Sequence, residues 1–150
     1  MTTEQPTIRR AVPGDLDGLL ALAEAYCAAD HHDFAADRVR AAMAPLLEDD
    51  RHGIILVLDG LRGPSGYAVV TWGYSIESGG IECLLDEIYI ADRGRGLGRR
   101  LLDACLARAR EHGCRTMFLE TEAHNDGARR FYARAGFTAE TSVWMGRPLI

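Results

Sequence analysis

The chain has 150 residues, 47% of them hydrophobic and 26% charged, a balance typical of a single soluble globular domain. Its 22 acidic residues outnumber its 17 lysines and arginines, and the net charge of -5 disfavours a nucleic-acid-binding protein. Nowhere do about 18 apolar residues run together, and the first ten residues have no apolar core, so we expect neither a membrane partner nor a secretion signal.

The first 50 residues predict one strand and two helices. Residues 7–10 have room for a short strand, and apolar residues then recur at helical spacing through residues 16–26. A polar break at His31 and His32 separates this helix from a second one in residues 34–47. We expect these adjacent histidines to be solvated rather than to bind a metal.

The middle of the chain predicts an antiparallel meander of three strands. The apolar runs at residues 54–58 and 67–72 are separated by glycine-rich turn signals, and a Gly-Gly pair precedes the third strand at residues 81–90. The third strand carries two adjacent acids, Asp86 and Glu87. Strand alternation places their side chains on opposite faces unless a bulge redirects the chain.

The last third predicts two helices and two strands. An amphipathic helix covers residues 97–109 and ends at a His-Gly pair, and a strand at residues 116–119 follows it. Asn125 or Asp126 can cap a further helix that ends at Gly136, and we expect a final strand at residues 142–145.

The four cysteines of the sequence are far apart and include no C-x-x-C pair: Cys27, Cys83, Cys105 and Cys114. This spacing indicates neither a zinc site nor a disulfide framework. We therefore expect no metal and a reducing, cytoplasmic location.

A glycine-rich segment, R-G-R-G-L-G-R-R at residues 93–100, lies between a predicted strand and a predicted helix. Glycines allow successive backbone N–H groups to point at one place, and a helix start adds roughly half a positive charge, so the segment predicts a phosphate site. The alternative is a glycine-rich turn with solvated arginines. The dinucleotide-binding pattern G-x-G-x-x-G and the Walker pattern both fail here.

Two motifs together resemble the GNAT superfamily of N-acetyltransferases. They are R-x-x-G-x-G at residues 93–98 and N-x-x-A-x-x-F-Y-x-x-x-G-F at residues 125–137. The resemblance implies a single α/β domain over residues 1–150, with a central mixed, mostly antiparallel sheet flanked by helices. Its strands would be splayed between Ile90 and Thr116 to admit acetyl-CoA.

The resemblance also implies which residues bind acetyl-CoA. The strand Ile88, Tyr89 and Ile90 would pair with the pantetheine arm, and the amide of Asn125 would bind the same arm. The pyrophosphate would lie on the loop formed by Arg93, Gly94, Arg95, Gly96, Leu97, Gly98 and Arg99.

Acetyl transfer to an amine needs a base, because an alkyl amine with a pKa of about 10.4 is protonated at neutral pH. Glu87 and Asp86 are equal candidates, and Glu120 is a third. Similarity to polyamine acetyltransferases points to Asp86, and similarity to ribosomal-protein acetyltransferases points to Glu120. Each acid could instead be a surface or ion-paired carboxylate.

The family match makes Tyr132 the acid that protonates the leaving thiolate. Without that match, Tyr132 reads as an aromatic residue that packs beside Phe131 and Phe137. A strand N–H near Ile88 or Tyr89 is expected to stabilise the developing oxyanion.

The acceptor site is expected after the first helix, at Tyr26 and Asp30, and on the hairpin, at Trp72 and Glu77. Glu120, directly after the strand at residues 116–119, is a further candidate for this site. Acids in both places suit a small cationic amine that attacks directly in a ternary complex. A peptide or protein acceptor, at an N-terminus or a lysine, is the alternative within the same enzyme class. A non-catalytic module that senses acetyl-CoA is the alternative outside it, and the family resemblance makes a homodimer unsurprising.

Overall fold

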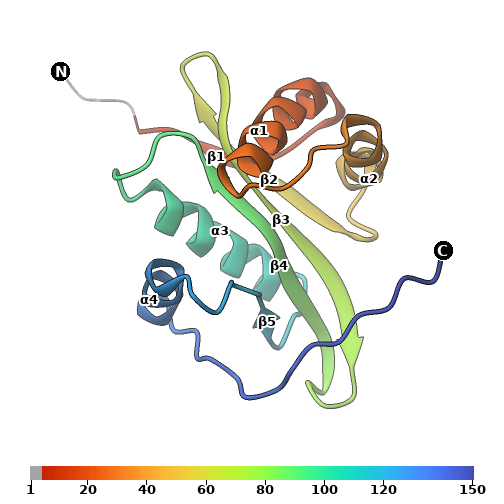
Figure 1. Cartoon of the computed structure of the whole chain (residues 1–150). Helices are drawn as coiled ribbons and strands as arrows, with labels where there is room; N and C mark the ends of the chain where they lie inside the picture. The colour runs from red at the N-terminus through yellow and green to blue at the C-terminus, as the bar shows by residue number, and fades with distance from the viewer. Residues whose placement is uncertain (1–4) are drawn as a thin grey trace. The chain divides into compact units, whose positions relative to one another are not determined.

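The structure, a computed structural model, describes residues 5–150. The chain divides into two compact units, the first ending at Leu119 and the second covering Glu120–Ile150. Figure 1 shows the elements along the chain. The first unit contains β1 (Ile8–Arg10), η1 (Pro13–Asp15), α1 (Leu16–Ala29), α2 (Ala36–Glu48), β2 (Gly53–Gly60), β3 (Gly63–Ser75), β4 (Gly80–Ile90), α3 (Leu97–Glu111) and β5 (Met117–Phe118). Each of these α-helices and strands was expected from the sequence, although β3 is longer and β5 shorter than predicted.

The five strands form one mixed sheet in the order β1-β2-β3-β4-β5. Neighbours from β1 to β4 pair antiparallel, and β4 pairs parallel with β5. The last ladder has only two register pairs, Cys83 with Met117 and Leu84 with Phe118. The fold class predicted from the sequence is therefore confirmed. The pairing of β4 with β5 ends at Leu84, although β4 itself continues to Ile90.

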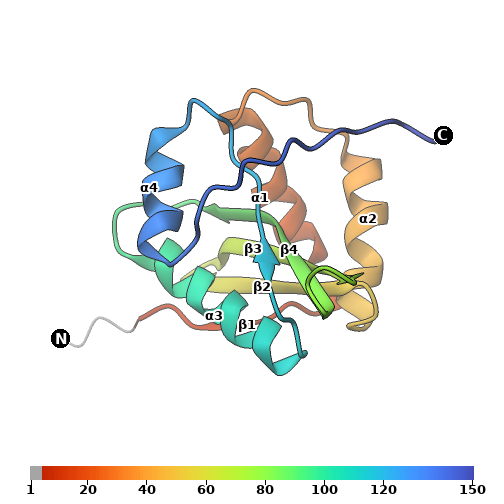
Figure 2. The ribbon, with the colours of Figure 1, turned by 90° about the horizontal axis from the view of Figure 1, so that it is seen from below.

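The sheet has a helical layer on each face (Figure 2). Helices α1 and α2 cover one face, where Leu19, Tyr67 and Val69 belong to a buried apolar cluster. Helix α3 covers the other face with one apolar side: Leu101, Leu102 and Cys105 are fully buried. Residues on β4 can therefore be assigned to the α1/α2 face or the α3 face by their partners on β3.

A β-bulge interrupts β4 at Asp86. Val69 on β3 pairs with Glu87, but its neighbour Val70 pairs with Leu85, so Asp86 is an extra residue with no partner on β3. Regular alternation would have placed Glu87 on the α3 face with Leu85. The bulge instead places Glu87 with Val69 on the α1/α2 face and re-aims the residue before it.

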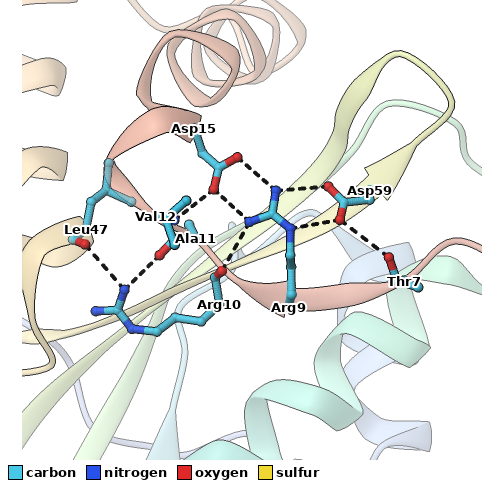
Figure 3. A network of polar contacts seen from close by, with 8 residues as sticks. All are labelled: Thr7, Arg9, Arg10, Ala11, Val12, Asp15, Leu47 and Asp59. Carbon is cyan, nitrogen blue, oxygen red and sulfur yellow. Dashed lines mark hydrogen bonds and ion pairs between the residues drawn. The ribbon is translucent and has the colours of Figure 1, made fainter.

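An arginine network fixes the first strand to the sheet and to η1 (Figure 3). The Arg9 guanidinium donates to both carboxylate oxygens of Asp15, at 2.8 and 2.9 Å, and to both of Asp59, at 2.8 and 3.1 Å. Asp15 also accepts a hydrogen bond from the backbone N–H of Val12. These bonds to Arg9 lower the pKa of Asp15, so they stabilise the fold while Asp15 is ionised.

We expect Arg9→Ala to lower the free energy of unfolding by about 1–2 kcal/mol at pH 7, because it removes bidentate bonds to two carboxylates at a partly exposed site. The contribution of a carboxyl whose pKa is lowered on folding is lost as pH falls. The difference from wild type should therefore shrink below about pH 4. Urea unfolding at several pH values measures this. Arg40→Ala is the control, because its pair with Asp17 is exposed; an equal loss in that variant would contradict the prediction.

Helix α4 (Asp126–Arg134) lies in the second unit and was predicted from the sequence. Of the two candidate caps, Asn125 and Asp126, the structure has Asn125 as the N-cap. The Asn125 side chain accepts a hydrogen bond from the backbone N–H of Ala128 at 3.0 Å, and Gly136, with φ +95°, ends the helix. The strand expected at residues 142–145 is wrong: α4 is the last element in the described chain. A run of three apolar residues followed by Gly146 and Pro148 has little capacity to extend a backbone ladder.

Candidate active site

The best-defined polar contact on the α1/α2 face joins Tyr67 and Glu87. The Tyr67 hydroxyl donates to Oε2 of Glu87 at 2.6 Å, and the Tyr67 side chain is fully buried. Burial raises the pKa of Glu87 and the charge of Asp86 adds to the effect, while the hydrogen bond from Tyr67 opposes it. The protein therefore holds, in a fixed position, a carboxyl that binds a proton more readily than an exposed glutamate.

Asp86 lies on the same side of the sheet as Glu87, because both carboxylates line one cavity. The cavity has a volume of about 150 Å³ and is formed by β3, β4 and α2. Its walls are Arg38, Val39, Ala42, Met43, Leu46, Val69, Asp86 and Glu87. The bulge thus brings the two candidate bases to one cavity. Without a bulge, strand alternation would have placed them on opposite faces of the sheet.

Asp86 is more open to solvent than Glu87. Enough protein still surrounds the Asp86 carboxyl for burial to raise its pKa. No hydrogen bond to Asp86 is present among residues 5–150, in contrast to the bond between Tyr67 and Glu87. Of the two acids, Glu87 is therefore the one whose position is fixed by the fold.

Two of the residues predicted for the acceptor site lie near these acids. The ring of Tyr26, in the last turns of α1, is 5.8 Å from that of Tyr89, which in turn is 6.5 Å from the ring of Tyr67. Burial raises the pKa of Tyr26, and the charges of Asp30 and Glu87 add to this. Tyr26 thus belongs to the surroundings of Glu87, and Asp30 acts on Tyr26 through its charge.

Trp72 and Glu77 do not lie at this cavity. The Trp72 ring stacks on His112 at 3.9 Å, at the end of α3, and its indole N–H donates to the carbonyl of Asp50. Glu77 is exposed in the turn beyond Ser75. Ser75 is six residue steps along β3 from Val69, a distance of about 20 Å. The structure therefore does not bring these two residues together with Glu87.

The glycine loop after β4 has the backbone conformation that glycine allows. Gly94 has φ +88° and Gly96, the N-cap of α3, has φ +71°. A Cβ added at either position would meet no atom within 4 Å, so conformation rather than space is what requires glycine there. Within the described chain, the backbone N–H groups of Gly94, Gly96, Leu97 and Gly98 donate to no protein atom. These donors at a helix start form a site that can accept an anion.

The arginines around this loop differ in their partners. Arg95 pairs with Asp92 at 3.1 Å, and Arg99 pairs with Asp103 at 3.0 Å. Arg93 is exposed and forms no ion pair with residues 5–150. The positive field of the loop is therefore weaker than its arginine count suggests, and Arg93 contributes most directly.

Backbone groups of Ile88, Tyr89 and Ile90 pair with β3 on one side, where these residues oppose Ala68, Tyr67 and Gly66. Their other edge lies beyond the last register pair with β5. Such an edge offers N–H and C=O groups to an extended ligand arm. The loop follows directly, after Ala91 and Asp92.

The second unit holds the remaining predicted residues, Glu120, Asn125 and Tyr132. The side-chain oxygen of Asn125 is used as the helix cap, which leaves its NH2 group as the donor for a ligand. The Tyr132 ring packs edge-on against Phe131 at 5.1 Å and Phe137 at 5.8 Å. The packing expected for Tyr132 without the motif is thus present, and a role of its hydroxyl as an acid stays a prediction.

Neither Tyr67 nor the cavity residues of α2 were predicted as site residues from the sequence. Tyr67 lies in an apolar run where a tyrosine is normally a core residue, and its partner depends on the bulge. Arg38, Ala42 and Leu46 share a helix face by their spacing, but spacing does not reveal that the face borders a cavity.

We expect Tyr67→Phe to raise the pKa of Glu87, because the hydrogen bond that favours the ionised carboxylate is lost. Carbon-13 NMR titration of the Glu87 carboxyl measures this without any assay of activity. Tyr74→Phe is the control, since Tyr74 is 79% exposed. An unchanged or lower Glu87 pKa in Tyr67→Phe would contradict the assignment.

The described residues include no helix that is long and apolar enough to span a membrane. They also include no group of three or more histidine, cysteine, aspartate or glutamate side chains arranged to hold a metal ion.

A model of the acetyltransferase (GNAT) family matches residues 19–137. An integron cassette protein from the mobile metagenome of Cole Harbour Salt Marsh is 27% identical, with a TM-score of 0.84 over 95% of this chain and 90% of its own. A protein assigned as an acetyltransferase from Arthrobacter sp. FB24 is 26% identical, with a TM-score of 0.82 over 99% and 98% of the two chains. Aminoglycoside N-acetyltransferase AAC(6')-Iy, solved with CoA, is 18% identical, with a TM-score of 0.82 over 100% of both chains, and shares the fold. No curated protein matches the chain.

Proposed function

Because the chain belongs to the GNAT family of acetyltransferases, we propose that it transfers the acetyl group of acetyl-CoA to a small primary amine. The amine attacks directly while both substrates are bound. The observation that carries this proposal is the Glu87 carboxyl, which has a raised pKa, lines a cavity, and lies on the strand that leads into the glycine loop.

The loop fits the pyrophosphate of acetyl-CoA, which supplies the acetyl group as an activated thioester. The N–H groups of Gly94, Gly96 and Gly98 are available as donors, and Arg93 adds a positive charge that has no ion-pair partner in residues 5–150. Leu97 supplies a further N–H, and Arg95 and Arg99 add charge that Asp92 and Asp103 partly offset. The edge of β4 at Ile88, Tyr89 and Ile90 can receive the pantetheine arm. The role of Asn125 as a further donor to this arm rests on the family resemblance of its motif alone.

Glu87 acts as the general base, directly or through one water. A carboxyl with a raised pKa is a better proton acceptor than an exposed one, and the Tyr67 hydroxyl keeps it in place. Asp86 attracts the ammonium form of the amine and is the second candidate. Glu120 is the third, supported by sequence similarity alone.

The thiols support direct attack rather than a cysteine-bound intermediate. Burial raises the pKa of Cys83 and Cys105 to about 12 each. The pKa of Cys27 is raised by burial and by the charges of Glu87 and Asp30. A thiol that resists ionisation is a poor nucleophile. The four free cysteines also support our proposal of a cytoplasmic location.

Release of free thiol from acetyl-CoA in the presence of a panel of amines and peptides tests the proposed function. We expect release that depends on a small primary amine. Release only with peptides would favour the alternative of a protein acetyltransferase. Cofactor binding with no release from any acceptor would favour the alternative of a sensor and would overturn the enzyme proposal.

A further inference from the structure

The cavity beside Glu87 has apolar walls and charges of both signs. Met43, Leu46 and Val69 are buried in its wall, and Val39 and Ala42 extend the apolar surface along α2. Asp86 and Glu87 supply the negative groups, and Arg38 supplies the positive one. A ligand in this cavity therefore meets an aliphatic surface together with two opposite kinds of charge.

Arg38 is not engaged with either acid. Within residues 5–150 it forms no ion pair, although it borders the same cavity as Asp86 and Glu87. Its neighbour on the helix, Arg40, pairs with Asp17 at 3.2 Å and does not line the cavity. The Arg38 charge is thus available to a ligand, while the Arg40 charge already has a partner.

The cavity is open to solvent, so its volume of about 150 Å³ describes only the part of a ligand that it surrounds. That part is a body of about six carbons, the size of benzene. The additional ammonium groups of an aminoglycoside or a polyamine would share this site with Arg38. A second positive charge close to an arginine is unfavourable.

We propose that the acceptor is a small amino-acid-like molecule, in which a primary amine is joined through a short aliphatic body to one carboxylate. This rests on the proposed function and narrows it. The amine lies at Asp86 and Glu87, the aliphatic body contacts the α2 wall, and the carboxylate pairs with Arg38. The cationic acceptor expected from the sequence is therefore kept at the amine end of this ligand, and a negative charge is added at its other end.

Three amines of similar length test the proposal: 6-aminohexanoate, hexylamine and 1,6-diaminohexane. They place a carboxylate, a methyl group or an ammonium group at the far end. Thiol release gives kcat/KM for each. We expect 6-aminohexanoate to be used best and 1,6-diaminohexane least. Because Arg38 is exposed, the preference for the carboxylate over the methyl group should be about fivefold. This preference should fall as salt is added.

Variants at two arginines separate recognition by Arg38 from the general charge of the helix. Arg38→Glu should reverse the order, so that 1,6-diaminohexane exceeds 6-aminohexanoate. Arg38→Lys should retain part of the preference. Arg40→Glu is the matched control and should leave the order unchanged. Melting curves of the variants confirm that each is folded.

A preference of the wild type for 1,6-diaminohexane would overturn the inference. An equal effect of Arg38→Glu and Arg40→Glu on the order would also overturn it. In both cases thiol release would still support the proposed function. Activity with peptides or aminoglycosides and none with the three amines would overturn the inference and leave the chain an N-acetyltransferase. Absence of release with every acceptor would instead mean that the proposed function itself fails.

Discussion

Replacing Glu87 with glutamine is expected to lower kcat/KM for amine acetylation by about 100- to 10,000-fold, the range usual for loss of a general base. Glutamine keeps the shape of the side chain and can still accept a hydrogen bond from the Tyr67 hydroxyl. It cannot take a proton from the amine. In the wild type, the rate should rise with pH through the raised pKa of Glu87, and this limb should be absent in Glu87→Gln.

The loss in Glu87→Gln should not come from unfolding. A carboxyl whose pKa is raised on folding stabilises the fold below its unfolded pKa, about 4.3, and loses that contribution as pH rises through the folded value. At neutral pH the ionised Glu87 therefore opposes folding, and the variant should be at least as stable as the wild type. Asp86→Asn is the matched comparison and should have a smaller effect. A larger effect of Asp86→Asn would assign the base to Asp86 instead.

Replacing Tyr132 with phenylalanine is expected to lower kcat by about 100-fold, because the variant lacks the hydroxyl that would protonate the leaving thiolate. The ring contacts with Phe131 and Phe137 are retained, so helix α4 and its end should be preserved. Single-turnover kinetics measure the effect of the variant on the chemical step, and calorimetry of CoA binding measures its effect on affinity.

The role of Tyr132 as an acid predicts unchanged CoA affinity beside the lower kcat. Loss of affinity in parallel with kcat would indicate that the hydroxyl serves binding. Full activity in Tyr132→Phe would show that water or another group supplies the proton.

Much of the fold could be predicted because its signals are local. Helical spacing of leucines gave α1 and α3, and the Gly79-Gly80 pair gave the turn before β4. Gly96 is the N-cap of α3, at the end of the glycine-rich segment that was predicted to precede a helix. Asn125 is the N-cap of α4 and was one of its two candidate caps. The final strand was wrong because a strand forms only when a neighbour pairs with it, and a short apolar run does not specify that neighbour.

The candidate site was predicted less completely, because it depends on register and on contacts distant in sequence. A bulge at Asp86 changes the face of Glu87, and no pattern in the strand's residues signals one extra residue. The bond from Tyr67 to Glu87 spans 20 residues, and the network of Arg9 with Asp59 spans 50. Only the paired strands bring such groups together.

The binding of CoA to the backbone N–H groups of residues 94–98 can be measured residue by residue by nitrogen-15 NMR titration, with pantetheine as the comparison ligand. We predict that CoA shifts the amide signals of Gly94, Gly96 and Gly98 most strongly, and that pantetheine, which has no pyrophosphate, leaves them unchanged. Unchanged glycine amides at millimolar CoA, or equal shifts with both ligands, would contradict the account.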